Sequence, residues 1–337
     1  MKDYSWQRYW YKRGDNPQIT NGFLWVWGKY ENAAFSFDKF SQIPCLVLLG
    51  EPGMGKSIEI KRIFDNCQEE NALKHYLNLS SVPDTTHLYR KLFDLEKLKA
   101  WKNGQSNLYL FLDSLDEALL NIDTLSGILA DEIGELPTER LFLRVACRSA
   151  EWSNLSKFES RLKDLWREDK FQTLNLAPLQ QKDVIEAAKA EEQDGNKFLT
   201  EVFEKNVSPL AAKPIGLKLL LGIFKEKAEL PSNQTELYTR GCLDLCDEDD
   251  EDRPAAKKDK LNAEQRFRIA ARIAALMIFS NKSSIWTGRD TGELTDADIL
   301  ISELTGYFEK DTDNTEFRID DNAIRETIHK GLFTRFC

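Results

Sequence analysis

The chain has 337 residues, of which 42% are hydrophobic, so it can bury a sizeable core and is long enough for two or three domains. This composition excludes a disordered protein. The formal net charge of −10 and the isoelectric point of about 5.1 give no general attraction to nucleic acid or to anionic lipid, so neither is indicated as a partner. The first residues lack the apolar core of a signal peptide, and no later stretch offers about 18 uncharged apolar residues in a row. We therefore expect a cytoplasmic protein with no membrane partner.

The six cysteines lie in apolar or helical contexts, without the paired spacing that zinc sites need. Cys242 and Cys246 stand one helical turn apart, but none of the three histidines lies near them in the sequence. We expect buried thiols, which fits a reducing compartment.

Residues 1–43 form an N-terminal segment rich in aromatic side chains, among them Trp6, Trp10 and Trp25. Next to basic residues such as Arg8, an aromatic cluster could stack on nucleic-acid bases. More often such a cluster packs on a neighbouring domain. We predict a segment that covers the next domain.

The apolar run 45–49 leads into a glycine-rich loop and then into the helical apolar spacing of residues 58–64. The pattern of Gly, four residues and Gly-Lys-Ser predicts a strand, a phosphate-binding loop and the start of a helix. The glycines let backbone N–H groups point at phosphates, and the helix adds its positive N-terminal end. Lys56 would reach the β- and γ-phosphates of a nucleotide, and the Ser57 hydroxyl would complete a Mg²⁺ shell. The predicted binding residues are Gly50, Glu51, Pro52, Gly53, Met54, Gly55, Lys56, Ser57 and Ile58.

An acidic cluster follows a second strand at 75–79, a helix near 85–96 and an apolar strand over 107–113. Because parallel strands end at one edge of a sheet, the Asp113 carboxylate would emerge beside the phosphate loop and hold the Mg²⁺ shell, largely through water. Asp116 and Glu117 lie just beyond, where they could orient or deprotonate an attacking water.

A further strand over 140–149 ends in Arg148, whose guanidinium could contact two oxygens of a γ-phosphate or could form an ordinary surface ion pair. The segment 171–176 supplies a last strand. Alternating strands and helices over 44–177 predict an α/β core with a parallel sheet flanked by helices.

From residue 178 the strands give way to helices, over 182–192, 197–205, from Pro214 onward, and from about 232 to 246. Six consecutive acids at 247–252 open a charged segment that we interpret as a solvated linker, with calcium binding as the weaker alternative. Beyond it we expect a long helix over 262–280, helical pieces at 296–308 and 321–332, and short strands at 284–286 and 316–319. The predicted domains are an N-terminal segment (1–43), a core (44–177), a helical domain (178–247), a charged linker (248–260) and a C-terminal domain (261–337).

Together these residues make the chain resemble the NACHT branch of the STAND signalling NTPases, within the wider AAA+ family of P-loop proteins. The likeness is carried by GEPGMGKS at 50–57 and FLDSLDE at 111–117. Residues 146–149 look like the family's sensor strand, although Cys147 stands where a Thr or Ser commonly precedes the arginine. The stretch around Pro214 resembles the segment whose proline packs near the adenine, and residues 261–337 look like the start of a winged-helix domain.

The resemblance implies a slow ATPase that works as a switch: closed with ADP, open and homo-oligomeric with ATP, Mg²⁺-dependent, driven by an unknown trigger, and set in bacterial antiphage defence. A later family motif with an ADP-contacting histidine has no match around His329, so we expect a truncated chain. Two alternatives stay open. One is an AAA+ remodelling ATPase that cycles on nucleic acid or protein; the other is a nucleotide-stabilised scaffold without functional hydrolysis.

Overall fold

A computed structural model of the chain describes residues 4, 6–26, 33–67, 71–119, 122, 124–247, 261–282, 284–286 and 298–328. By internal contacts the chain divides into two compact units, Met1–Lys218 (unit 1) and Leu219–Cys337 (unit 2). The division falls inside helix α11 (Pro214–Lys227).

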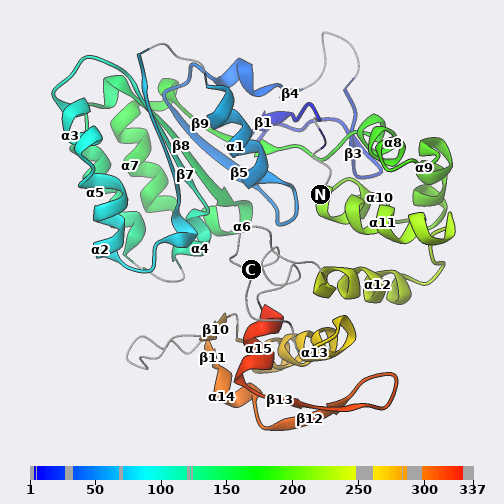
Figure 1. Ribbon diagram of the computed structural model, residues 1–337. Coiled ribbons are helices and arrows are strands. Elements are labelled where there is room, and N and C mark those ends of the chain that lie inside the picture. The colour runs from blue at the N-terminus through cyan, green and yellow to red at the C-terminus, as the bar shows by residue number, and fades with distance from the viewer. Residues whose placement is uncertain are drawn as a thin grey trace. The chain divides into compact units, whose positions relative to one another are not determined.

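Unit 1 is built on a seven-stranded sheet with the order β4-β1-β9-β5-β8-β7-β6 (Figure 1). Five adjacent strands of this sheet, from β9 to β6 in that order, run parallel to one another. Strands β5 and β7 are buried along their whole length. Continuous apolar sequence is what a parallel strand covered on both faces requires. The predicted parallel sheet flanked by helices is therefore confirmed. The parallel strands are β5 (Cys45–Gly50), β6 (Leu73–Asn78), β7 (Leu108–Asp113), β8 (Leu141–Arg148) and β9 (Phe171–Leu176).

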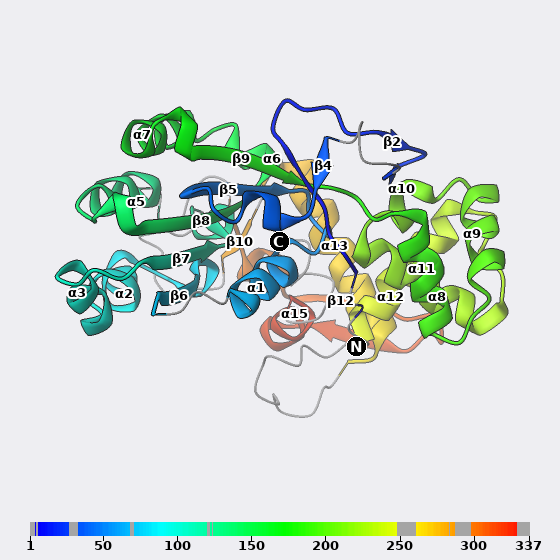
Figure 2. The ribbon, with the colours of Figure 1, turned by 90° about the horizontal axis from the view of Figure 1, so that it is seen from above.

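Helices cover both faces of this sheet (Figure 2). Alternate side chains of β5 point to opposite faces, so Val47 packs in one apolar cluster and Leu48 in the other. The cluster around Val47 contains side chains of α3 (Glu96–Lys102), α5 (Leu125–Gly134) and α7 (Ser156–Trp166). The cluster around Leu48 contains side chains of α1 (Lys56–Asn66) and of the 3-10 helix η1 (Phe37–Phe40).

Several short elements connect the strands. The helix predicted over 85–96 is divided into α2 (Thr85–Leu88), a π-helical turn η3 (Tyr89–Phe93) and the start of α3. The Asp84 side chain caps α2 by accepting from the His87 backbone N–H, at 2.8 Å. The remaining connections are η2 (Leu79–Ser81), α4 (Leu115–Leu119), η4 (Thr138–Arg140), α6 (Ser149–Trp152) and η5 (Glu168–Lys170).

The N-terminal segment extends the sheet, which the sequence did not predict. β1 (Trp10–Lys12) pairs antiparallel with β9, opposite Leu176, and β4 (Ala34–Phe35) pairs with β1. Trp10 is fully buried in the cluster around Leu48. This pairing joins β1 and β4 to the core and covers the edge that β9 would otherwise leave unpaired. A separate hairpin is formed by β2 (Ile19–Thr20) and β3 (Phe23–Leu24).

Helices α8 (Gln181–Ala190), α9 (Gly195–Glu204) and α10 (Ser208–Ala211) lie together beside the sheet (Figure 2). Gln180 and Asp183 form a capping box that begins α8. Internal contacts group these helices with the sheet in unit 1, whereas the sequence predicts a boundary at 177/178. That boundary, like the one at 247/248, stays a prediction.

Unit 2 combines helices with short strands. The strands predicted at 284–286 and 316–319 are present, but the helix predicted over 296–308 is wrong, because a strand and a single helical turn precede a hairpin there. The elements are α12 (Gln234–Asp247), α13 (Ala263–Ser280), β10 (Ser284–Trp286), β11 (Asp298–Leu300), α14 (Ile301–Leu304), β12 (Tyr307–Lys310), β13 (Glu316–Ile319) and α15 (Asp321–Ile328). The charged linker predicted at 248–260 and the residues around His329 lie outside the described ranges.

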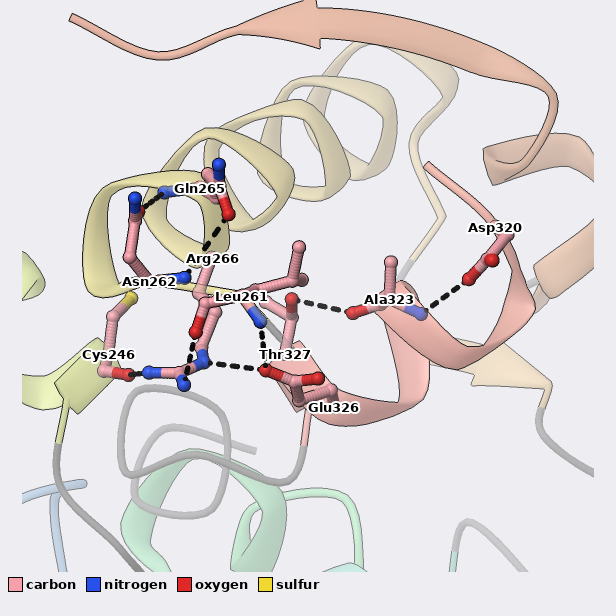
Figure 3. A network of polar contacts seen from close by, with 9 residues as sticks. All are labelled: Cys246, Leu261, Asn262, Gln265, Arg266, Asp320, Ala323, Glu326 and Thr327. Carbon is pink, nitrogen blue, oxygen red and sulfur yellow. Dashed lines mark hydrogen bonds and ion pairs between the residues drawn. The ribbon is translucent and has the colours of Figure 1, made fainter. Parts of the chain in front are cut away.

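Arg266 of α13 joins three parts of unit 2 (Figure 3). Its guanidinium donates to the backbone oxygens of Cys246 at 2.8 Å and Leu261 at 2.6 Å, and its Nε pairs with Glu326 at 3.1 Å. Glu326 also accepts from the Leu261 backbone N–H at 3.1 Å. Only 3% of Arg266 is exposed. The last turn of α12, Leu261 just before the N-cap of α13, and the helix α15 therefore all contact one buried cation.

Among the described residues, no helix combines the length and the apolar character needed to cross a membrane. Three of the cysteines are buried, as the sequence predicts: Cys45, Cys147 and Cys246.

Candidate nucleotide-binding site

The glycine-rich loop connects β5 to α1 in a conformation that requires glycine. Gly53 and Gly55 both have a φ of +76°, in the left-handed region that L side chains rarely adopt. A Cβ placed on Gly53 would also collide with Cγ2 of Ile215. Gly55 is the N-cap of α1, so the loop ends at the positive end of that helix. Strand, loop and helix follow one another as the motif requires.

The start of α11 lies against this loop. The Ile215 backbone N–H donates to the Gly53 oxygen at 3.4 Å, and a Cβ on Gly55 would lie 3.4 Å from Cγ of Pro214. Lys213, just before the helix, pairs with the Glu51 carboxylate at 2.6 Å. Pro214, predicted to lie near the adenine, is thus placed beside the loop.

Arg8 is a site residue that the sequence did not single out for this role. Its Nη1 donates to the Met54 oxygen at 2.8 Å and its Nη2 to the Ala177 oxygen at 2.9 Å. Arg8 is only 6% exposed, and burial lowers its pKa to about 10, partly offset by the charges of Glu59 and Asp183. The guanidinium therefore ties the phosphate loop to the end of β9. Its acceptors are backbone carbonyls, which leave no signature in a sequence.

Lys56, the first residue of α1, carries a largely desolvated ammonium group. Burial lowers its pKa, against the opposing effect of Asp116 and Asp113, whose negative charges favour the protonated form. Within the described part of the chain, no carboxylate lies within ion-pair distance of Lys56. A partly buried cation without a close counter-charge suits an anionic ligand such as a phosphate.

Asp113 ends β7 and is fully buried. Its Oδ2 accepts from the Tyr76 hydroxyl at 2.9 Å, and its Oδ1 accepts from the Ser114 backbone N–H at 2.8 Å. Tyr76 comes from β6, which pairs directly with β7, so the neighbouring strand orients this carboxylate. No local sequence pattern singles out Tyr76. Ser57 lies exposed in the first turn of α1. A serine hydroxyl and a carboxylate are oxygen donors of the kind that Mg²⁺ prefers.

Arg148 ends β8, the strand between β5 and β7, and it engages both acids that follow Asp113. Its Nε lies 2.8 Å from the Asp116 carboxylate and its Nη2 lies 3.6 Å from Glu117. The Arg148 backbone N–H also donates to Asp116, at 2.9 Å. The three predicted catalytic residues are therefore in direct contact.

The charges around Glu117 pull its pKa in opposite directions. Burial raises it above the ordinary value, and the negative charges of Asp116 and Asp113 raise it further. Arg148 and Lys56 lower it. The raised pKa of Glu117 suits a proton acceptor, and the positive charge of Arg148 limits the size of this increase.

Comparisons with known proteins find similar structures but no similar sequence or family. No protein-family model matches the chain, and no curated protein matches its sequence. One structural match, to a chain in a structure of Drosophila ORC bound to DNA, has 17% identity and a TM-score of 0.31, over 60% of this chain and 56% of that chain. Another, to a mutant of RuvB from Thermotoga maritima, has 14% identity and a TM-score of 0.32, over 73% of each chain. Identities and scores this low establish no family.

The fold and the site define the class on their own. The chain is an α/β protein with a mostly parallel sheet flanked by helices, and a phosphate-loop sequence joins its β5 to α1.

Proposed function

We propose that this chain binds ATP and ADP with Mg²⁺ and hydrolyses ATP slowly. The observation that carries the proposal is the partly buried Lys56 ammonium at the end of a loop whose Gly53 and Gly55 adopt positive φ. A strand, such a loop and a helix N-terminus form a binding site for nucleotide phosphates.

In this proposal the loop residues Gly50–Ser57 hold the phosphates, Lys56 contacts the β- and γ-phosphates, and Ile58 and Pro214 border the nucleotide. Mg²⁺, held by Ser57 and Asp113, would neutralise the charge that develops on the phosphates.

Hydrolysis needs a group that orients water and accepts its proton. Glu117 takes this role, because its pKa is raised and it is only partly enclosed. Asp116 is held by both the side chain and the backbone of Arg148, which suits a positioning residue. Arg148 sits close enough to both acids to set their positions, in addition to the predicted contact with a γ-phosphate.

We further propose that the hydrolysis serves a switch of the NACHT type, closed with ADP and open and homo-oligomeric with ATP, in antiphage defence in the cytoplasm. What supports a switch is the course of α11: its first turn contacts the phosphate loop, while its later residues belong to unit 2. A nucleotide that prefers one arrangement of this helix shifts the equilibrium only by that difference in affinity.

The test is single-turnover and steady-state hydrolysis by Glu117→Gln, with nucleotide affinity measured by calorimetry. We expect affinity within about threefold of wild type and turnover lower by about 100-fold or more, because general-base catalysis contributes about that much. Glu135→Gln, an exposed acid beyond the site, is the matched control and should turn over normally. Normal turnover by Glu117→Gln would remove Glu117 from its role.

A further inference from the structure

A cavity lies on the α1 face of the sheet, and its lining includes no residue of the phosphate loop. Its volume is about 410 Å³, within the range of small-molecule sites. No residue of the loop 50–57 lines it; α1 contributes only residues from Glu59 onward. Representative lining residues are Phe37 and Ser41 beside η1, Arg62 and Asn66 of α1, and Tyr109 and Arg144 of the sheet.

Arg144 supplies a buried positive charge in the cavity wall. It is only 1% exposed, and burial lowers its pKa to about 10. Its Nη1 donates to the Pro44 and Leu143 oxygens, at 3.0 and 2.9 Å, and its Nη2 donates to the Ser41 oxygen at 2.6 Å. These bonds use three of the five N–H donors of a guanidinium. Within the described ranges, no Asp or Glu lies within ion-pair distance of Arg144.

The other charges of the cavity do not neutralise this one. Glu59 pairs with Arg62 at 3.1 Å on α1, which compensates both. Asp38 is exposed to solvent, where its charge is screened. A buried cation that is hydrogen-bonded to carbonyl oxygens and has no carboxylate partner keeps a desolvation cost, and an anion placed beside it would offset part of that cost.

Three aromatic side chains contribute to the wall, beside polar side chains such as Gln42 and Asn66. Phe37, Tyr109 and Phe111 line the cavity, and Tyr109 stacks on Phe142 with ring centroids 4.5 Å apart. The Arg144 guanidinium carbon lies 6.0 Å from the Phe37 ring centre. These aromatic faces next to a buried cation suit a planar ring that carries a negative group.

We propose that this cavity is a second ligand site, which takes a small aromatic anion such as an aryl carboxylate or sulfonate, with its negative group toward Arg144 and its ring between the aromatic side chains. The site is independent of the proposed nucleotide chemistry, because it shares no residue with the phosphate loop.

The probe for the test is anilinonaphthalene sulfonate, an aromatic anion whose fluorescence rises in apolar surroundings. We expect saturable binding of one probe per chain by the whole protein. Asn66→Trp fills the cavity from the exposed side of α1 and should weaken binding about tenfold or more. Asp65→Trp, next to it but outside the cavity, is the matched control and should bind like wild type.

Two further measurements identify the site. Arg144→Met should lower the affinity for the probe about tenfold or more, because it removes a charged hydrogen-bond donor. If that variant fails to fold, Asn66→Trp decides the matter, since it leaves Arg144 in place. Probe binding should persist in Lys56→Ala and in excess ATP. Equal binding by Asn66→Trp and Asp65→Trp, displacement of the probe by ATP, or no saturable binding would each overturn the proposal.

Discussion

Two positively charged side chains of unit 1, Arg8 and Lys56, differ in the groups that compensate their charge. Arg8 is held by two backbone oxygens and lies near the charges of Glu59 and Asp183. Lys56 is desolvated too, yet the described chain offers it no carboxylate within ion-pair distance. Buried charges are retained where a partner compensates them. Arg8 therefore acts as a structural clamp, whereas Lys56 needs an anionic ligand to complete its surroundings.

Removing Arg148 should change the pH dependence of hydrolysis. A general base works only when deprotonated, so activity falls as the pH drops through the pKa of Glu117. Burial and the negative charges of Asp116 and Asp113 raise that pKa, while Arg148 lowers it. In Arg148→Met the acidic limb of the pH–rate profile should therefore move to higher pH, whatever happens to the maximal rate.

The matched control for that profile is Arg161→Met. Arg161 pairs with Asp131 on the surface, at 2.6 Å, and takes no part in the site. Its acidic limb should coincide with that of wild type. An unmoved limb in Arg148→Met, or a shift to lower pH, would contradict the assignment of Glu117 as the base.

Arg8→Met should lower the free energy of unfolding by about 2 kcal/mol, because it leaves two buried carbonyl oxygens without their charged donor. Arg13→Met is its control: Arg13 is well exposed, pairs with Glu159 at 3.3 Å, and should cost less than about 0.5 kcal/mol. Urea unfolding measures both. Equal midpoints for the two variants would show that the Arg8 clamp contributes nothing.

At the scale of elements, the phosphate loop depends on its backbone and on the helix beside it. Gly53→Ala should lower both stability and nucleotide affinity, because Gly53 has a φ of +76° and its new Cβ would meet Ile215. Adding Ile215→Ala should restore part of the loss, since it removes the collision but not the backbone strain. Thermal unfolding and calorimetry measure the two effects.

Gly127→Ala is the control for this substitution. Gly127 is exposed in α5 with nothing within 4 Å of its Cβ position, so alanine there should stabilise the chain by about 0.5 to 1 kcal/mol. If Gly53→Ala behaved like Gly127→Ala, the loop would not need its observed conformation.

The sequence predicts those elements that local patterns specify. Continuous apolar runs and the glycine motif predict β5, β7, β8 and the start of α1. The pairing of β1 with β9 brings Trp10 opposite Leu176, and no local pattern encodes a partner so far along the chain. The predicted site residues lie in or near recognisable motifs. Arg8 instead acts through two backbone carbonyl oxygens, and Tyr76 reaches Asp113 from the neighbouring strand, so neither has a local sequence signature. The cavity likewise arises only when η1, α1 and the sheet come together.

In unit 2, we expect the contacts of Arg266 to make α12, α13 and α15 unfold together. Arg266→Met should destabilise unit 2 by about 3 kcal/mol, because it leaves Glu326 and two carbonyl oxygens without their buried partner. Hydrogen exchange should rise in the last turn of α12 and in α15, and remain unchanged in β5 and β7.

Arg268→Met in the same helix is the control. Arg268 pairs with Glu264 one turn away at 3.2 Å, half-exposed, and its loss should leave exchange nearly unaltered. Faster exchange confined to α13 in Arg266→Met, with α12 and α15 unchanged, would contradict the idea that this cation holds the three parts together.

The proposed nucleotide-dependent switch is tested first by the nucleotide that is released when freshly purified protein is denatured. We expect nearly one ADP per chain in wild type and none in Lys56→Ala; Lys61→Ala, a change at an exposed lysine of the same helix, should behave like wild type. A wild-type protein that releases no nucleotide and binds no added ATP would rule out the proposed nucleotide site. An empty site that turns over added ATP rapidly would contradict the switch and favour a cycling remodelling ATPase.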